Sequence, residues 1–367
     1  MQNDHLLIEI DGAEASDLKC DLIGLDIELD EELAGMFRMT LALRLRADGS
    51  WTHLDDGRFA LWRKVAVTAG LKDDARKLLT AYITHVRPEF GPGMEQCRLE
   101  VWGMDGSVLM DRTDVLKAWP NMKDSDIAAL VFQKAKLTPQ VADTTVVHNE
   151  EISTIVQRET DIRFLKRLAL RNGYECFVDG GTGYFRPPDL GGTVQAPLNV
   201  HAGARTNVNK FSLEVNALAP ADVTMSGLDH ATGGPLEAVS RPGHEPALGA
   251  RRPADALPGG MKPGQVRVAR TVATGGHEME SICQALHDRG EWFVSGEGEV
   301  AANQYGAVLL PRRTVVVNGV GATHSGTYYV THVTHRFREN SYNQHFRVKR
   351  NALTAARAGV GLPGGVR

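Results

Sequence analysis

The chain has 367 residues, which is enough for two or three domains and for a core that needs neither disulfides nor metals for its stability. Its 41 Lys and Arg residues nearly balance 45 Asp and Glu residues, and this net charge of −4 argues against a dedicated nucleic-acid-binding or membrane-surface protein. The longest apolar runs, such as 6–8 and 315–317, are far shorter than the roughly 20 residues of a membrane-spanning helix.

The N-terminal residues carry no basic segment before an apolar run, so no secretory signal is predicted and the chain is expected to be made in the cytoplasm. The cysteines are too widely spaced for a zinc motif or a disulfide framework, and they are expected to be reduced: Cys20, Cys97, Cys176 and Cys283. The 38 glycines and the short runs of Val, Thr and Tyr predict many turns between strands, hence a mainly β fold.

Residues 1–115 are predicted to form a first tube-like antiparallel β-barrel. Leu6, Ile8 and Ile10 alternate with Leu7, Glu9 and Asp11, and the same period of two recurs over 25–29. Further strands are expected, separated by turns rich in Gly, Asp and Ser, over 37–45, 64–68, 79–86 and 96–102.

Residues 116–200 are predicted to form an α+β insert domain, because the apolar period there changes to that of a helix. One helix begins at the acidic segment 124–126, and a second begins with Thr160 as its N-cap and ends at Gly173. A hairpin follows over 174–186, with the glycine-rich segment 180–183 as part of its turn.

A second tube-like barrel is predicted from 201–225 and 265–355, with a helix over 276–290. Between these parts, the 39 residues 226–264 contain eight glycines, six prolines and no aromatic residue, so they are expected to form a Pro/Gly-rich loop without its own core. Residues 356–367 are expected to be a flexible tail.

The two barrels are predicted to be duplicates. Residues 82–90 and 329–337 align without gaps and are identical at five of nine positions, and a similar strand precedes and follows each copy. Shared β-strand composition is the alternative explanation. If both segments are regular strands, Val86 points the same way as Tyr82, and Val333 points the same way as Tyr329.

No catalytic, cofactor-binding or metal-binding residue is predicted. The densest histidines are His324, His332, His335 and His345. The odd separation of His332 and His335 places them on opposite faces of a strand, and His335 is expected to be a packed, hydrogen-bonded side chain. The acidic run 26–32 is interpreted as a solvated strand face instead of a pair of glycosidase carboxylates, and neither a phosphate-binding loop nor a nucleophile elbow occurs.

Two segments carry a resemblance to a known family. The first matches an E-T-D-x-x-F-L-x-R-L signature through Glu159, Thr160, Asp161, Phe164, Leu165, Arg167 and Leu168, and runs into Gly173 and Tyr174. The second comprises 326–335 with Tyr342, Phe346 and 349–351. Both resemble the phage late-control protein D family, the baseplate hub proteins of contractile phage tails and related injection systems, including the hub part of type VI secretion spike proteins.

The resemblance implies two tube-like barrels and an α+β insert, assembled as a homotrimer around a central channel. Six similar units would then adapt a six-fold tail tube to a three-fold spike. The implied partners are the tail tube protein, a separate spike protein and other baseplate proteins, with the chain ending in the tail tip or baseplate. The helical signature is expected to have a packing role, and no cofactor is implied.

Two other functions are weighed against this structural one. A peptidoglycan hydrolase at the tip of the same machine would need converging carboxylates or a metal triad, which the sequence does not display. A carbohydrate-binding module would need exposed aromatic residues, and most of the 23 Phe, Trp and Tyr residues are needed for cores.

Overall fold

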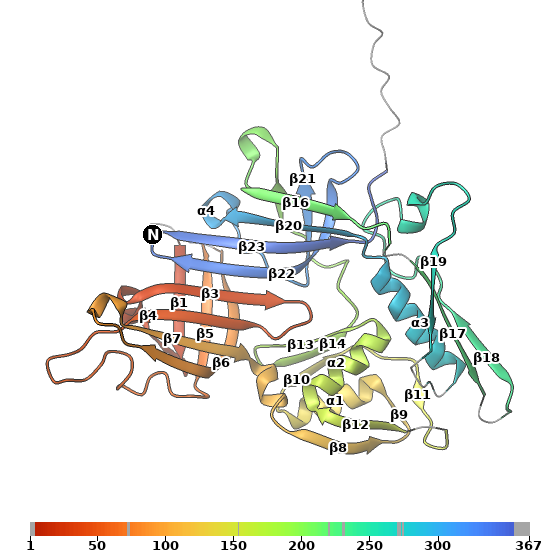
Figure 1. The fold of residues 1–367 in the computed structure, drawn as a ribbon, viewed down its shortest axis with the longest axis horizontal. Helices are drawn as coiled ribbons and strands as arrows, with labels where there is room; N and C mark the ends of the chain where they lie inside the picture. The colour runs from red at the N-terminus through yellow and green to blue at the C-terminus, as the bar shows by residue number, and fades with distance from the viewer. Residues whose placement is uncertain are drawn as a thin grey trace, which may run out of the picture.

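A long, mostly antiparallel β-sheet dominates the fold, flanked by a helical insert and by a small sheet that is covered by one helix (Figure 1). This computed structural model describes residues 4–71, 74–152, 154–218, 221–229, 232–269, 273 and 275–355. The predicted fold class, mainly β with a small α+β insert, is confirmed. None of the helices within these described ranges has the length and apolarity that a membrane crossing needs.

The long sheet contains two units. The first unit comprises β1 (Asp4–Ile10), β2 (Ala13–Glu14), β3 (Leu22–Asp30), β4 (Met36–Ala42), β5 (Lys64–Leu71), β6 (Asp74–Glu89) and β7 (Arg98–Asp105). The second unit comprises β15 (Gln195–Asn199), β16 (Lys210–Val215), β20 (Val294–Ala301), α4 (Ala302–Tyr305), β21 (Thr314–Asn318), β22 (Gly326–Arg338) and β23 (Ser341–Arg350). The first-unit strands are red to orange in Figure 1, and most of the second unit is blue.

The two units have the same strand order. Hydrogen-bonded neighbours follow β3-β4-β7-β6-β5-β1 in the first unit and β16-β20-β23-β22-β21-β15 in the second. When the six strands of each unit are numbered by their order along the chain, strands with the same number occupy the same place in the two units. One difference is that β1 pairs with β5 in antiparallel fashion whereas β15 pairs with β21 in parallel fashion. The duplication predicted from 82–90 and 329–337 therefore agrees with the topology, since these segments lie on the equivalent strands β6 and β22.

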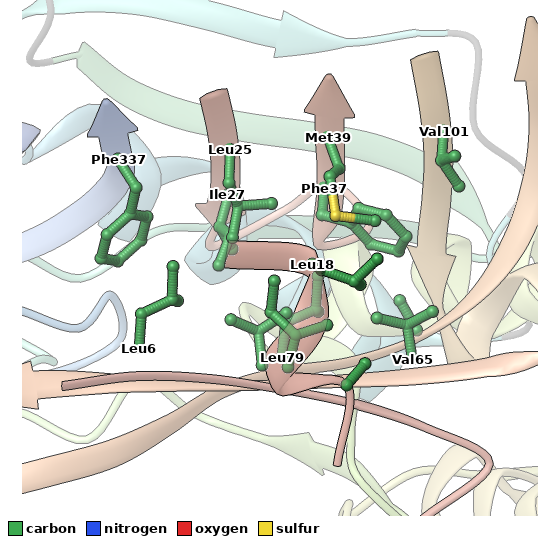
Figure 2. Packing of buried hydrophobic residues seen from close by; sticks show 14 of the residues in the cluster. Leu6, Leu18, Leu25, Ile27, Phe37, Met39, Val65, Leu79, Val101 and Phe337 are labelled. Atoms are coloured by element: carbon green, nitrogen blue, oxygen red, sulfur yellow. The ribbon is translucent and has the colours of Figure 1, made fainter. Parts of the chain in front are cut away.

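Each unit has its own apolar core. In the first, residues alternating along the strands point to one side, as Figure 2 shows for Leu25, Ile27, Phe37 and Met39. Phe337 of β22 lies beside Leu25 in the same core, so a strand of the second unit completes the first. The second core contains buried residues of β20 to β23: Val294, Val300, Val315, Val317, Tyr328, Val330, Val333, Phe346 and Val348.

Equivalent β-bulges interrupt β6 and β22. The register of β6 against β7 shifts between Ile83 and His85, and that of β22 against β23 shifts between Val330 and His332. These positions match in the alignment of 82–90 with 329–337. The duplicated strands therefore share a β-bulge as well as a similar sequence. A bulge inserts one extra residue into a strand, so side chains beyond it point to the face opposite to the one that strict alternation predicts.

The bulges overturn the prediction about side-chain direction. Val330 and Val333 both lie in the second core, whereas Tyr329 contacts Glu175 outside that core. Likewise, Ile83 and Val86 both pack in the first core. The prediction that Val333 follows Tyr329, and Val86 follows Tyr82, is wrong because the period of two does not continue through a bulge.

The insert packs two helices, α1 (Asp124–Lys134) and α2 (Asp161–Asn172), around short strands. These strands are β8 (Asp114–Trp119), β9 (Met122–Lys123), β10 (Thr138–Val141), β11 (Val147–His148), β12 (Ile155–Thr160), β13 (Glu175–Asp179) and β14 (Thr182–Arg186). Phe132, Phe164 and Phe185 are fully buried in its core. As predicted, Gly173 ends α2 in the left-handed conformation, with φ of 68°. Strand β15, placed by the sequence inside 116–200, instead pairs with β21 of the second unit.

Residues 226–264 form the predicted loop only in part, because 226–228, 235–239 and 264 belong to strands. Strands β17 (Ala221–Leu228), β18 (Pro235–Val239) and β19 (Gly264–Val268) form a three-stranded sheet under α3 (Gly276–Gly290). Val223, Met225, Ala238, Met279 and Cys283 are buried between them. Only Ala238 of these five residues lies within 226–264, so the segment adds a strand to a core that 223–225 and α3 mainly build from small and flexible side chains. This group, called the α3 unit below, also takes β17, β19 and α3 out of the predicted second barrel.

The remainder of that segment is held by the end of β23. The Arg350 guanidinium, 1% exposed, donates to the Leu248 carbonyl at 2.8 Å, and Asn351 receives a hydrogen bond from the Leu248 amide at 2.9 Å. A bridge between Arg251 and Leu353 continues this contact. The segment is therefore anchored by buried polar partners, a force that Pro and Gly content does not reveal. The predicted tail, 356–367, lies outside the described residues.

Candidate functional site: the seam between the two units

The seam is the region where β3 of the first unit pairs with β22 of the second, together with the loop 31–35 and the parts of the insert and α3 unit that face it. Antiparallel pairing runs from His332 opposite Asp30 to Arg338 opposite Gly24. The two units are thus joined by backbone hydrogen bonds as well as by side chains.

The acidic run 26–32 lies along this seam and supplies ion pairs across it. The pairs are Asp26 with Arg338 at 2.9 Å, Asp30 with His332 at 3.0 Å, Glu31 with Lys349 at 2.7 Å and Glu32 with Arg289 at 2.6 Å. The interpretation of this run as a solvated strand face holds only in part, because β22, β23 and α3 bring basic side chains beside it. Exposed pairs contribute about 0.2–1 kcal/mol each, so their main effect is to specify which strands meet.

In the ion pair between Asp30 and His332, both side chains also form further hydrogen bonds. Burial alone would raise the pKa of Asp30, but hydrogen bonds from His332 and from the backbone amides of Glu32 and Leu33 outweigh it and lower the pKa to about 2. The second ring nitrogen of His332 lies 2.9 Å from the Thr334 hydroxyl. Asp30 is therefore a fixed negative charge at the seam.

A buried hydrogen bond joins the insert to the second unit. The Tyr329 hydroxyl donates to a carboxylate oxygen of Glu175, on β13, at 2.5 Å. Burial raises the pKa of Glu175 and that of Tyr329. The Tyr329 ring also lies 5.9 Å from that of Trp292 and 5.7 Å from the Lys349 ammonium. Breaking this contact would leave a buried carboxyl group without its phenol donor.

Arg312 touches both units and the insert. Its backbone amide donates to the Val330 carbonyl at 2.8 Å, its guanidinium donates to the Asp30 carbonyl, and the same group lies 3.8 Å from the centroid of the Phe177 ring. Its φ of 60° is the left-handed conformation, which non-glycine residues rarely adopt. Burial lowers the pKa of Arg312, and the negative charge of Glu175 opposes this shift.

A second ionic network joins the insert to the α3 unit. Arg171 of α2 donates to Asp124 of α1 at 2.7 Å and to Glu278 of α3 at 3.2 Å, and His148 lies 3.2 Å from Asp124. Burial alone would raise the pKa of Asp124, but hydrogen bonds from His148 and Arg171 outweigh it and lower the pKa. Removing one partner of such a buried pair typically costs about 3–5 kcal/mol. The network therefore fixes α3 against the insert.

The histidines highlighted by the sequence are dispersed by the fold. His335 is fully buried, with Nδ1 2.9 Å from the Tyr342 hydroxyl, whereas His332 faces Asp30. His345 pairs with Glu299 at 3.2 Å, and the His324 carbonyl accepts a hydrogen bond from Tyr328. The packed role predicted for His335 is confirmed. Across the described ranges, no three His, Cys, Asp or Glu side chains are grouped as metal ligands.

The helix α2, which carries the family signature, packs against the insert core as predicted, but Thr160 before it does not cap the helix with its side chain. Thr160 occupies the N-cap position, but its hydroxyl donates to Asp111 at 2.5 Å instead of capping the helix. Further along α2, Lys166 donates to the Glu32 carbonyl at 2.6 Å. Thr160 of the signature thus ties the start of α2 to Asp111, and Lys166, at a variable position of the signature, ties α2 to the seam.

Neither Arg312 nor Glu175 was predicted from the sequence to have a role at a site. Glu175 had a detectable signal, because it is a charged residue directly before the buried, strand-forming residues Cys176 and Phe177. Arg312 had none: Pro311, Arg312 and Arg313 before a strand have the composition of an ordinary loop.

This arrangement of two units, an insert and a seam is similar in fold to solved phage tail proteins. The 43 kDa tail protein of prophage MuSo2 from Shewanella oneidensis has a TM-score of 0.67 and 14% identity, with 95% of this chain and 99% of that chain covered. The tail protein from Neisseria meningitidis MC58 has a TM-score of 0.66 and 14% identity, with 95% and 97% covered.

A component of the E. coli type VI secretion system, described as structurally similar to the T4 bacteriophage tail proteins gp27 and gp5, has a TM-score of 0.52 and 11% identity over 94% of this chain and 76% of that chain. The predicted resemblance to baseplate hub proteins is thus confirmed in the fold. Residues 15–339 match the model of the family described as the Alg8 N-terminal domain, and the chain belongs to this family. The sequence matches no curated protein.

Proposed function

We propose that the chain is the structural hub of the baseplate in a contractile tail or a related injection system. Three copies form a ring around a central channel, and each contributes two similar units, so that six units face a six-fold tail tube while the trimer faces a three-fold spike. The observation that carries the proposal is the identical strand order of the two units. The shared fold with tail proteins supports it.

The proposed partners are the tail tube protein, a separate spike protein and other baseplate proteins. The chain is assembled in the cytoplasm and resides in the tail tip, where cargo or genome passes through the ring. Ion pairs and backbone pairing at the seam suit this role, because they hold the two units of one chain in a fixed relation.

We also propose that the hub is not an enzyme. The carboxylates of the run 26–32, the ones considered for glycoside hydrolysis, include four that are engaged in ion pairs across the seam. A peptidoglycan hydrolase needs one carboxyl group free to donate a proton and another to act as base or nucleophile. Incubation of the purified chain with peptidoglycan should therefore release no soluble fragments.

Native mass measurement over a range of protein concentrations tests the assembly. The expected species has three times the 40.0 kDa mass of one chain. In addition, density of the assembled particle should show six barrel-like units between tube and spike. A tip that contains one, two or six copies of the chain would contradict the proposal, as would release of peptidoglycan fragments.

A further inference from the structure

A cavity of about 500 Å³ opens between the first unit, the hairpin β13–β14 of the insert and the segment 310–314. It does not belong to the ion-pair seam, although Asp30 and Arg312 border both. We propose that this cavity is a binding site for a carboxylate group, and this inference does not depend on the hub function.

The wall of the cavity is a stack of guanidinium groups and aromatic rings. Phe177 and Tyr184 stack with their centroids 4.6 Å apart. The Arg312 guanidinium covers Phe177 at 3.8 Å, and the Arg186 guanidinium lies 5.3 Å from the Tyr184 centroid. Stacking of this kind fixes the plane of a guanidinium and leaves its N–H edge to recognise a planar anion.

Polar atoms without partners line this cavity. Within the described ranges, Nε of Arg186, Nε of Arg312 and the hydroxyl of Thr314 are buried and form no hydrogen bond. Thr314 is 1% exposed. Buried polar groups in folded proteins are nearly always satisfied, so three such atoms around one cavity indicate that a ligand with acceptor oxygens completes them.

The charges around the cavity favour a carboxylate over a phosphate. The exposed basic residues Arg76, Lys77 and Arg313 also line the cavity beside the half-buried Arg186 and Arg312, and together they favour an anion. Asp30 and Asp105 also line the cavity and disfavour a single group that carries two negative charges, as phosphate does at neutral pH. A single planar carboxylate matches the small number of open donors and the orientation of the guanidinium edges.

The carboxylate could be carried by a Glu or Asp of a partner protein or by a free dicarboxylate. Both sources can be tested by methyl NMR on the full-length chain with labelled threonine, because Thr193 and Thr314 both line the cavity. The probes are N-acetyl-glutamate N-methylamide, the matching glutamine compound, glutarate and inorganic phosphate. The glutamate compound or glutarate should shift the Thr193 methyl in a saturable manner, and the glutamine compound should bind at least tenfold more weakly.

Variants assign the binding to the cavity. Arg186→Gln and Thr314→Val should each weaken carboxylate binding about tenfold, whereas Thr314→Ser, which keeps the hydroxyl, should retain it. Arg46→Gln, on an exposed loop outside the cavity, is the matched control and should bind as the wild type does. Unchanged unfolding midpoints will show that the variants are folded. If Arg186→Gln does not fold, the comparison of Thr314→Val, which should lose binding, with Thr314→Ser, which should keep it, still tests the proposal.

Tighter binding of the capped glutamate than of glutarate supports a protein partner as the source, and the reverse supports a free dicarboxylate. The proposal is overturned if neither carboxylate gives a saturable shift, if glutamate and glutamine compounds bind equally, or if phosphate binds more tightly than both carboxylates.

Discussion

His335 gives the chain a predictable loss of stability in acid. The ring is fully buried in β22 and its Nδ1 contacts the Tyr342 hydroxyl at 2.9 Å. Burial, aided by repulsion from His332, lowers the pKa of His335 from 6.5 to about 3. Between these two pH values the unfolded chain binds a proton at this residue and the folded chain does not. The free energy of unfolding therefore falls as pH drops below 6.5 and continues to fall toward pH 3.

The size of this effect follows from the two pKa values. Each pH unit within the window is equivalent to about 1.4 kcal/mol. At pH 5, roughly 1.5 units below the unfolded-state value, His335 should destabilise the chain by about 2 kcal/mol relative to pH 8. Glu245 acts in the opposite direction, because burial raises its pKa to about 7. The contribution of His335 must therefore be isolated with a variant.

The assay is urea denaturation of the wild type and of His335→Gln at pH 8 and pH 5. Glutamine is uncharged at both pH values and retains a polar group near Tyr342. The variant should lose about 2 kcal/mol less than the wild type between pH 8 and pH 5. His277→Gln, at a side chain that is 94% exposed, is the control and should lose as much as the wild type. An equal loss in wild type and His335→Gln would refute the reasoning.

Three further outcomes follow from the packing. Tyr329→Phe removes the hydroxyl that donates to buried Glu175, so it should lower the free energy of unfolding by about 1–3 kcal/mol, as measured by urea denaturation. A smaller loss would show that this hydrogen bond contributes little to stability. Gly103→Ala places a Cβ 2.7 Å from a backbone oxygen and should lower the melting temperature through about 1–3 kcal/mol of overpacking, whereas Gly181→Ala meets nothing within 4 Å and should not. Thiol titration of the native chain should show one fast-reacting cysteine, exposed Cys20, and a Cys20→Ser variant should show none.

Local periodicity was sufficient to predict most strands of the first unit and the helix over 276–290, whose bounds the structure reproduces. These elements have apolar residues at regular spacing, and the duplicated nonapeptides marked equivalent strands before any pairing was known. The α3 unit was missed because its sheet draws buried residues from β17, β18 and α3, separated by up to about 60 positions. No single segment of it contains a recognisable core.

The seam was beyond prediction for a related reason. Asp30 and His332 are adjacent only because β3 and β22 pair across some 300 residues of sequence. An acidic run beside alternating apolar residues has the same appearance whether solvent or a basic strand lies opposite. The left-handed conformation of Arg312 also depends on tertiary contacts, which a loop composition of Pro and Arg does not specify.

The pairing of β3 with β22 has a mechanical consequence. Seven consecutive residue pairs connect the two units along one sheet. Phe337, on a strand of the second unit, is buried in the core of the first unit. Close-packed interiors transmit displacement with little compression, so a push on one unit reaches the other almost undiminished. The insert and the α3 unit are joined to this sheet mainly by side-chain contacts. We therefore expect a displacement of one unit to pass to the other unit more readily than to these two parts.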